Sequence, residues 1–164
     1  MGARLGPGLL IAVVVAALDQ ASKWWIITQV MDPPRYVEVT PFFNLVMAWN
    51  RGVSFGLFNN DSPYNAWVLT GLATVIVIAL LVWLVRSEGK MVLVGIGLVV
   101  GGAVGNVVDR LRYGAVADFL DFHVAGLHWP AFNLADSTIT VGALLLVLDS
   151  LFRGSETPKN GDRA

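Results

Sequence analysis

The sequence predicts an all-α integral membrane protein with four transmembrane helices and a small extracytoplasmic β-sheet cradle and loop between the first two helices. Composition is the first reason. Hydrophobic residues make up 55% of the 164 residues and charged residues 14%, against about 25% charged residues in soluble domains. The second reason is that four apolar segments reach the roughly 20 residues that a spanning helix needs. They are about residues 7–30, 64–85, 91–110 and 132–152.

The first segment begins like a secretory signal peptide, because Arg4 precedes a long apolar run. However, Asp19 and Gln20 stand where small residues should lead to a cleavage site, and apolar residues continue beyond them. We therefore interpret this segment as a retained helix. A single membrane-embedded domain is expected over residues 1–154, and the polar residues 155–164 are expected to form a disordered cytoplasmic tail.

Two long connections are expected on the outer side. Residues 31–63 are rich in β-branched and aromatic residues after a Pro-Pro pair, which predicts short strands that form the sheet. Within them, residues 52–63 combine glycines with apolar residues, which suggests an apolar lid. The second connection, residues 111–131, is predicted to be a loop.

The distribution of Lys and Arg predicts the orientation, because cytoplasmic loops carry an excess of these residues. With both termini inside, the inner side carries Arg4, Arg86, Lys90, Arg153, Lys159 and Arg163, and the outer side carries Arg35, Arg51, Arg110 and Arg112. We therefore expect a multi-pass membrane protein with both termini in the cytoplasm.

Polar groups gather at one depth of the predicted bundle. With a rise of 1.5 Å per residue, Asp19 lies roughly 18 Å and Lys23 roughly 24 Å along the first helix. The other members of this set lie at the outer ends of the third and fourth helices or in the outer connections: Asn106, Asp109, Arg110, Asn133, Asp136, Asn50, Arg51 and Asp118. Because polar groups in a membrane usually mark function, this set predicts one site in the outer leaflet.

Several of these features also have structural explanations. Asp19 and Lys23 are four residues apart, so they are interpreted as a structural ion pair in preference to a catalytic one. Small residues at every fourth position, Gly97, Gly101 and Gly105, indicate close helix packing. The Asp109-Arg110 pair is equally compatible with an anchor at the membrane interface.

Asp118 and Asp136 are the candidate acid–base pair. Asp118 could instead be a solvated turn residue, and Asp136 could simply complement the positive end of its helix. If the two carboxylates meet, they can share one proton and cleave peptides without metal or cofactor.

Other chemistries find little support. The chain has no cysteine and two histidines, and it contains neither HExxH nor GxSxG. The net charge of −1 argues against a nucleic-acid partner.

Five motifs together resemble those of the lipoprotein signal peptidases, the type II signal peptidase (prolipoprotein signal peptidase) family of bacterial membrane aspartyl peptidases. The motifs occur in the family's order, and the resemblance covers residues 5–153. They are DQASK (19–23), NRGVSFG (50–56), GGAVGNVVDR (101–110), VADF (116–119) and FNLAD (132–136).

The resemblance implies a function and a set of residues. Asp118 and Asp136 would be catalytic. Four residues would bind the substrate, Asn50, Asn106, Arg110 and Asn133, and three would support the site, Asp19, Lys23 and Asp109. The substrate would be a prolipoprotein in the lipid bilayer of the bacterial inner membrane. The protein would cut it just before a cysteine that carries diacylglycerol. No cofactor would be needed, and the cyclic peptide globomycin would inhibit the cleavage.

Two rival interpretations remain at this stage. The first is a proton-coupled transporter or channel that uses Asp19, Lys23 and Asp136 as a relay. The polar groups do not continue into the inner half of the predicted bundle, which argues against such a path. The second is a non-enzymatic membrane scaffold, which would not need so many ionisable groups at one depth.

Overall fold

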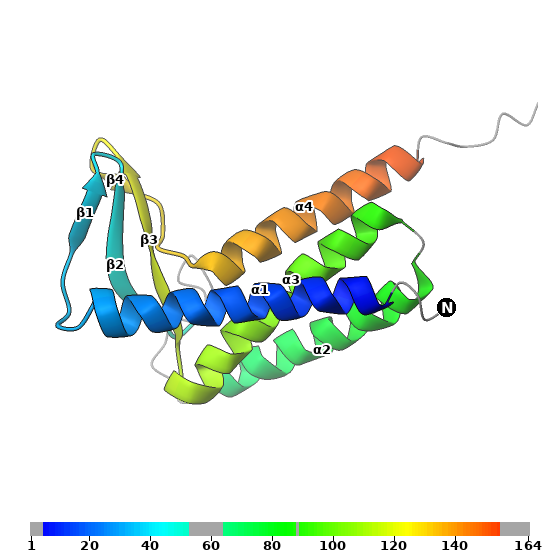
Figure 1. Ribbon diagram of the computed structural model, residues 1–164, viewed down its shortest axis with the longest axis horizontal. Coiled ribbons are helices and arrows are strands. Elements are labelled where there is room, and N and C mark those ends of the chain that lie inside the picture. Colours follow the sequence, from blue (N-terminus) through cyan, green and yellow to red (C-terminus); the bar gives the residue numbers. More distant parts are fainter. Residues whose placement is uncertain (1–4, 53–63, 88, 155–164) are drawn as a thin grey trace, which may run out of the picture.

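The computed structural model describes residues 5–52, 64–87 and 89–154, and it consists of a helical bundle with a sheet at one end (Figure 1). Residues 53–63 of the predicted lid and the predicted tail, residues 155–164, lie outside the described residues.

Four long helices form the bundle, and each is long and apolar enough to cross a membrane, as predicted. The first helix continues into a short π-helical segment, η1, without a break. The bounds are α1 (Leu5–Trp25), η1 (Ile26–Val30), α2 (Asn65–Arg86), α3 (Lys90–Tyr113) and α4 (Leu134–Gly154).

The centre of the bundle is α3, because α1, α2 and α4 all pack against it. Half of the apolar stretch of α3 is buried, against 6% of that of α2. The helices α2 and α4 hardly touch each other, so both flank α3 and otherwise face outward.

The predicted close packing of the glycine face is confirmed, and its partner is α1. A Cβ atom at Gly101 would lie 2.6 Å from Cβ of Val15 and 2.7 Å from the carbonyl oxygen of Ala12. One turn further along α3, a Cβ at Gly105 would collide with the carboxylate of Asp19. Only glycine lets the two backbones approach this closely, and the approach brings Asp19 against α3.

The sheet is antiparallel and has the order β1-β2-β3-β4. Its strands are β1 (Val37–Thr40), β2 (Phe43–Asn50), β3 (Val116–Val124) and β4 (Leu127–His128). The first two lie in the segment predicted to form strands. The prediction of a loop over residues 111–131 was wrong, because β3 and β4 lie there.

Apolar contacts fix the sheet to the end of the bundle. Phe119 of β3 packs with Ile26, Val30 and Met31, at the end of η1. The beginning of α1 and the end of α4 lie at the opposite end of the bundle (Figure 1). The sheet therefore holds β2 and β3 beside the last turns of α3 and the first turn of α4.

Candidate active site

The first turn of α4 is closed by a reciprocal cap that positions Asp136. The side chain of Asn133 accepts a hydrogen bond from the backbone N–H of Asp136 at 3.0 Å. In return, Oδ2 of Asp136 accepts a hydrogen bond from the backbone N–H of Asn133 at 3.2 Å. Such a capping box satisfies N–H groups that a helix start otherwise leaves unpaired. The helix therefore begins at Leu134, slightly later than predicted.

Asp118 lies on β3 and is 2% exposed, so the solvated-turn interpretation is wrong. Its Oδ1 accepts a hydrogen bond from Nδ2 of Asn133 at 2.7 Å, and its Oδ2 accepts one from Nδ2 of Asn50 at 3.0 Å. Burial, together with the nearby charge of Asp136, raises the pKa of Asp118 to about 7. A carboxyl group in this state can hold a proton near neutral pH.

Asn133 is the residue that links the two carboxylates. Its side chain donates to Asp118 and its backbone N–H donates to Asp136. Asn133 is itself completely buried, so these contacts are well fixed. The structure thus brings Asp118 and Asp136 together from a strand and a helix that a short segment connects.

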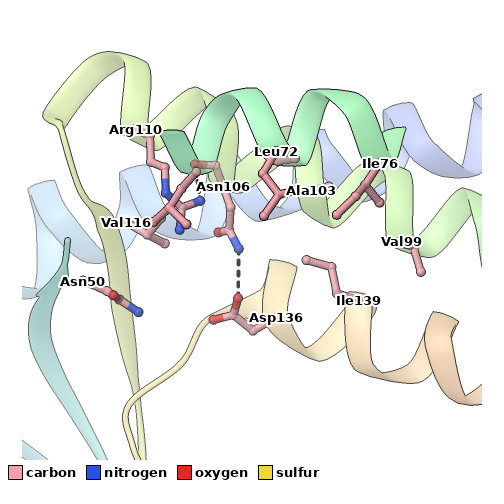
Figure 2. A pocket seen from close by; sticks show the side chains of 12 residues that line it. Asn50, Leu72, Ile76, Val99, Ala103, Asn106, Arg110, Val116, Asp136 and Ile139 are labelled. Carbon is pink, nitrogen blue, oxygen red and sulfur yellow. Dashed lines mark hydrogen bonds between the residues drawn. The ribbon is translucent and has the colours of Figure 1, made fainter. Parts of the chain in front are cut away.

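Asn106 of α3 connects Asp136 to Lys23 through hydrogen bonds. Its Nδ2 donates to Oδ1 of Asp136 at 2.8 Å (Figure 2). Its Oδ1 accepts hydrogen bonds from Nζ of Lys23 at 2.9 Å and from Nδ2 of Asn133 at 3.3 Å. Because Lys23 can only donate, it fixes the orientation of the Asn106 amide, and the N–H₂ group must face Asp136.

Lys23 is buried between two carboxylates. Its Nζ lies 2.9 Å from Asp19 and 2.9 Å from Asp109, so the predicted ion pair is present with a second acidic partner. Asp19 also accepts a hydrogen bond from the backbone N–H of Ala135 at the start of α4, at 2.9 Å. Asp109 accepts one from the backbone N–H of Ala117 on β3, at 3.1 Å. The cluster therefore ties α1 and α3 to the two elements that carry the carboxylate pair.

Asp109 is 1% exposed, which excludes it as an anchor at the membrane interface. Arg110 is half-buried, and its guanidinium donates to the carbonyl oxygen of Gly52 at 3.4 Å. The positive charge of Arg110 also interacts with Asp136 and Asp118.

Sequence reasoning missed Gln20. Its Nε2 donates to Oδ1 of Asp109 at 2.8 Å and to the carbonyl oxygen of Gly105 at 3.1 Å. An amide inside a spanning segment, next to Asp19, was the signal that could have identified it.

A cavity of about 290 Å³ lies beside the pair, between α2, α3 and α4 (Figure 2). Polar groups line its end near the sheet, namely Asn50, Asn106, Arg110 and Asp136. Away from the sheet its walls are apolar and include Leu72, Ile76, Val99 and Ile139. The cavity joins a hydrogen-bonding end to an apolar end, as binding of an amphiphilic chain requires.

Asp121 lies three residues beyond Asp118 but on the other face of β3, because side chains alternate along a strand. It accepts a hydrogen bond from Asn44 at 2.8 Å and contacts His128 at 2.9 Å. Burial acts to raise the pKa of Asp121, but these hydrogen bonds outweigh it and the pKa lies below its usual range. Over the described ranges, no three His, Asp or Glu side chains are arranged to hold a metal ion.

Four spanning helices with a linked carboxylate pair beside a cavity define a polytopic membrane protein with a candidate site of the aspartic-peptidase type. The chain matches the family model of signal peptidase (SPase) II over residues 11–152. The chain belongs to the signal peptidase II family of membrane proteases.

Individual relatives agree with this assignment. The chain is 45% identical to a lipoprotein signal peptidase of Nitrobacter hamburgensis, over 91% of this chain and 94% of the relative. It is 47% identical to one of Paraburkholderia phytofirmans, over 91% and 87% of the two chains. A solved bacterial membrane enzyme superimposes with a TM-score of 0.81 at 30% identity, covering 96% of this chain and 95% of the other. None of these relatives favours the transporter interpretation.

Proposed function

We propose that this protein removes the signal peptide from prolipoproteins whose cysteine carries a diacylglyceryl group, cutting the peptide bond just before that cysteine. The observation that carries the proposal is the link through Asn133, which donates to Asp118 at 2.7 Å and to Asp136 at 3.2 Å. The relatives that carry the name lipoprotein signal peptidase support the class of substrate.

In this proposal the two carboxylates have different roles. Asp136 is ionised and takes a proton from the water that attacks the scissile carbonyl carbon, while protonated Asp118 gives its proton to the carbonyl oxygen. When the tetrahedral intermediate breaks down, the C–N bond is cleaved, Asp136 protonates the leaving nitrogen, and Asp118 recovers its proton from the hydroxyl group.

The hydrogen bonds support these roles. Both oxygens of Asp136 accept hydrogen bonds, from the Asn106 amide and the Asn133 N–H, and these bonds hold the group in one orientation at the start of α4. Asp118 has no positively charged side chain in direct hydrogen-bond contact among the described residues, and its raised pKa favours the acid.

Substrate binding is assigned to Asn50, Asn106, Arg110 and Asn133. The guanidinium of Arg110 offers five donors for peptide carbonyl oxygens, and asparagine amides can both donate and accept. Asp19, Lys23 and Asp109 have a supporting role. They hold α1, α3, β3 and the start of α4 in place around Asp118 and Asp136.

We place both termini in the cytoplasm and the site in the outer leaflet. Because the sequence has no cysteine, each introduced cysteine is unique. Val124→Cys at the sheet end should react with a membrane-impermeant maleimide on intact cells, and Arg86→Cys should react only after permeabilisation. The reverse labelling would contradict this orientation.

The function is tested with purified protein in detergent and a synthetic prolipoprotein peptide whose cysteine carries a diacylglyceryl thioether. Mass spectrometry should find a product that begins with the lipidated cysteine, and globomycin should prevent its formation. The same peptide without lipid is the matched control and should remain uncut. Release at another bond, or equal cleavage of both peptides, would overturn the proposal.

A further inference from the structure

A second cavity borders Asp136 on another side of α4. It has a volume of about 380 Å³ and lies between the segment 129–132 and the first turns of the helix. Among the described residues, Asp136 alone lines both this cavity and the cavity between α2, α3 and α4. A bound substrate that extends across the carboxylate pair could therefore have one part in each cavity.

The walls of the second cavity present hydrocarbon. Trp129, Pro130 and Phe132 form one wall. On the other wall, the hydroxyl of Ser137 donates to the carbonyl oxygen of Asn133 at 3.0 Å, and that of Thr140 donates to the carbonyl oxygen of Asp136 at 2.8 Å. Both hydroxyls are thus engaged within α4, so neither needs a partner from a ligand.

The two cavities therefore differ in chemistry. The first carries Asn50, Asn106 and Arg110, which suit a peptide backbone. In the second, Asp136 is the only ionisable group in the described lining, and it lies where the two cavities meet. Both cavities have apolar walls, but the amide and guanidinium side chains lie in the first cavity alone among the described residues.

The second cavity lies on a side of α4 that faces the surroundings of the bundle. Trp129 is 59% exposed and Val141 is 50% exposed, and only 11% of the apolar stretch of α4 is buried. In a bilayer this face of the helix contacts lipid chains, and tryptophan is typical of the membrane interface. A lipid chain can reach the cavity without leaving the bilayer.

We propose that this second cavity binds an acyl chain of the diacylglyceryl group on the substrate cysteine. The inference rests on the proposed function. The cysteine follows the scissile bond directly. When this bond lies at the carboxylate pair, the lipid on the cysteine side chain therefore begins next to Asp136. Both cavities border Asp136, but Asn50, Asn106 and Arg110 of the first suit the peptide backbone, which leaves the second cavity, with its hydrocarbon walls, for this chain.

The test compares two synthetic prolipoprotein peptides that differ only in the cysteine lipid, one with two hexadecanoyl chains and one with two butanoyl chains. Val141→Trp fills the cavity. The matched control is Val13→Trp on α1, where the valine is 65% exposed and lines neither cavity. The measured quantity is kcat/KM for each peptide in the same detergent.

Each buried methylene adds about fourfold to binding, so loss of contact with two or three methylenes costs about tenfold or more. Val141→Trp should lower kcat/KM for the long-chain peptide by about that factor and leave the short-chain peptide unchanged, while Val13→Trp changes neither. An equal loss for both peptides, or no loss, would overturn the acyl site while cleavage by the wild type still supports the proposed function. If the wild type cuts neither peptide, both proposals fail.

A second measurement needs no variant. A hexadecanoyl chain that ends in a photoreactive diazirine should cross-link to residues 129–132 or 137–141 of the wild-type protein. Cross-links confined to residues 69–76 of α2 would place the chain in the first cavity and contradict the inference.

Discussion

Asp118 combines burial with hydrogen bonds that act on its pKa in the opposite direction. Burial and the charge of Asp136 raise the pKa to about 7, while the hydrogen bonds from Asn50 and Asn133 lower it. Because the proposed mechanism needs the protonated acid, activity should be present below pH 7 and be lost as the pH rises through about 7.

Asn50→Ala should move this alkaline limb of the kcat/KM profile to higher pH, by about one unit, since it removes a hydrogen bond that favours the carboxylate. The matched control is Asn44→Ala on the same strand, which loses a contact to Asp121 and should leave the limb in place. A limb that does not move in Asn50→Ala would show that Asp118 is not the group that titrates.

Lys23 is 2% exposed and lies between Asp19 and Asp109. Lys23→Met would leave two buried carboxylates without their cation, which typically costs about 3–5 kcal/mol. We expect a clear fall in the unfolding temperature in detergent, whereas Lys90→Met, at an exposed position, should change it little. Equal stability of the two variants would contradict a supporting role for Lys23.

At the scale of elements, the packing of α1 against α3 determines where the polar groups meet. Gly101→Ala places a Cβ 2.6 Å from Val15, so the helices must separate, at a cost of about 1–3 kcal/mol. Both the unfolding temperature and the cleavage rate should fall, because Lys23 would move away from Asn106.

The matched control is Gly71→Ala on α2, where nothing lies within 4 Å of the new Cβ. This variant should be as stable and active as the wild type. Similar losses in both variants would mean that the glycine face of α3 has no special role.

The four helices could be predicted because the length of an apolar run is a local property of the sequence. The strand β3 could not be predicted in the same way. Alternation identifies a strand that is buried on one face, but residues from Val116 to Phe119 are buried on both faces and their pattern does not alternate. The β-branched and aromatic residues of this segment were the only local signal.

At the scale of the whole molecule, the candidate site combines residues from α1, β2, α3, β3 and α4. The sequence could predict that polar groups gather at one depth of the bundle, because the rise per residue converts a position in a helix into a height along its axis. Which atoms touch depends on helix rotation and on the sheet, so the link through Asn133 and the contacts of Gln20 could not be derived from spacing.

The central claim is that Asp118 and Asp136 act as one catalytic pair, and cleavage of the diacylglyceryl prolipoprotein peptide by substituted enzymes tests it most directly. Asp118→Asn and Asp136→Asn keep the shape of each side chain and remove its ability to exchange a proton. Asp121→Asn is the matched control, since this residue lies on the other face of β3.

We predict that Asp118→Asn and Asp136→Asn each lower kcat by about a hundredfold or more while their unfolding temperatures stay near that of the wild type. Asp121→Asn should keep its activity. Wild-type activity in a folded Asp118→Asn or Asp136→Asn variant would contradict the assignment of the pair.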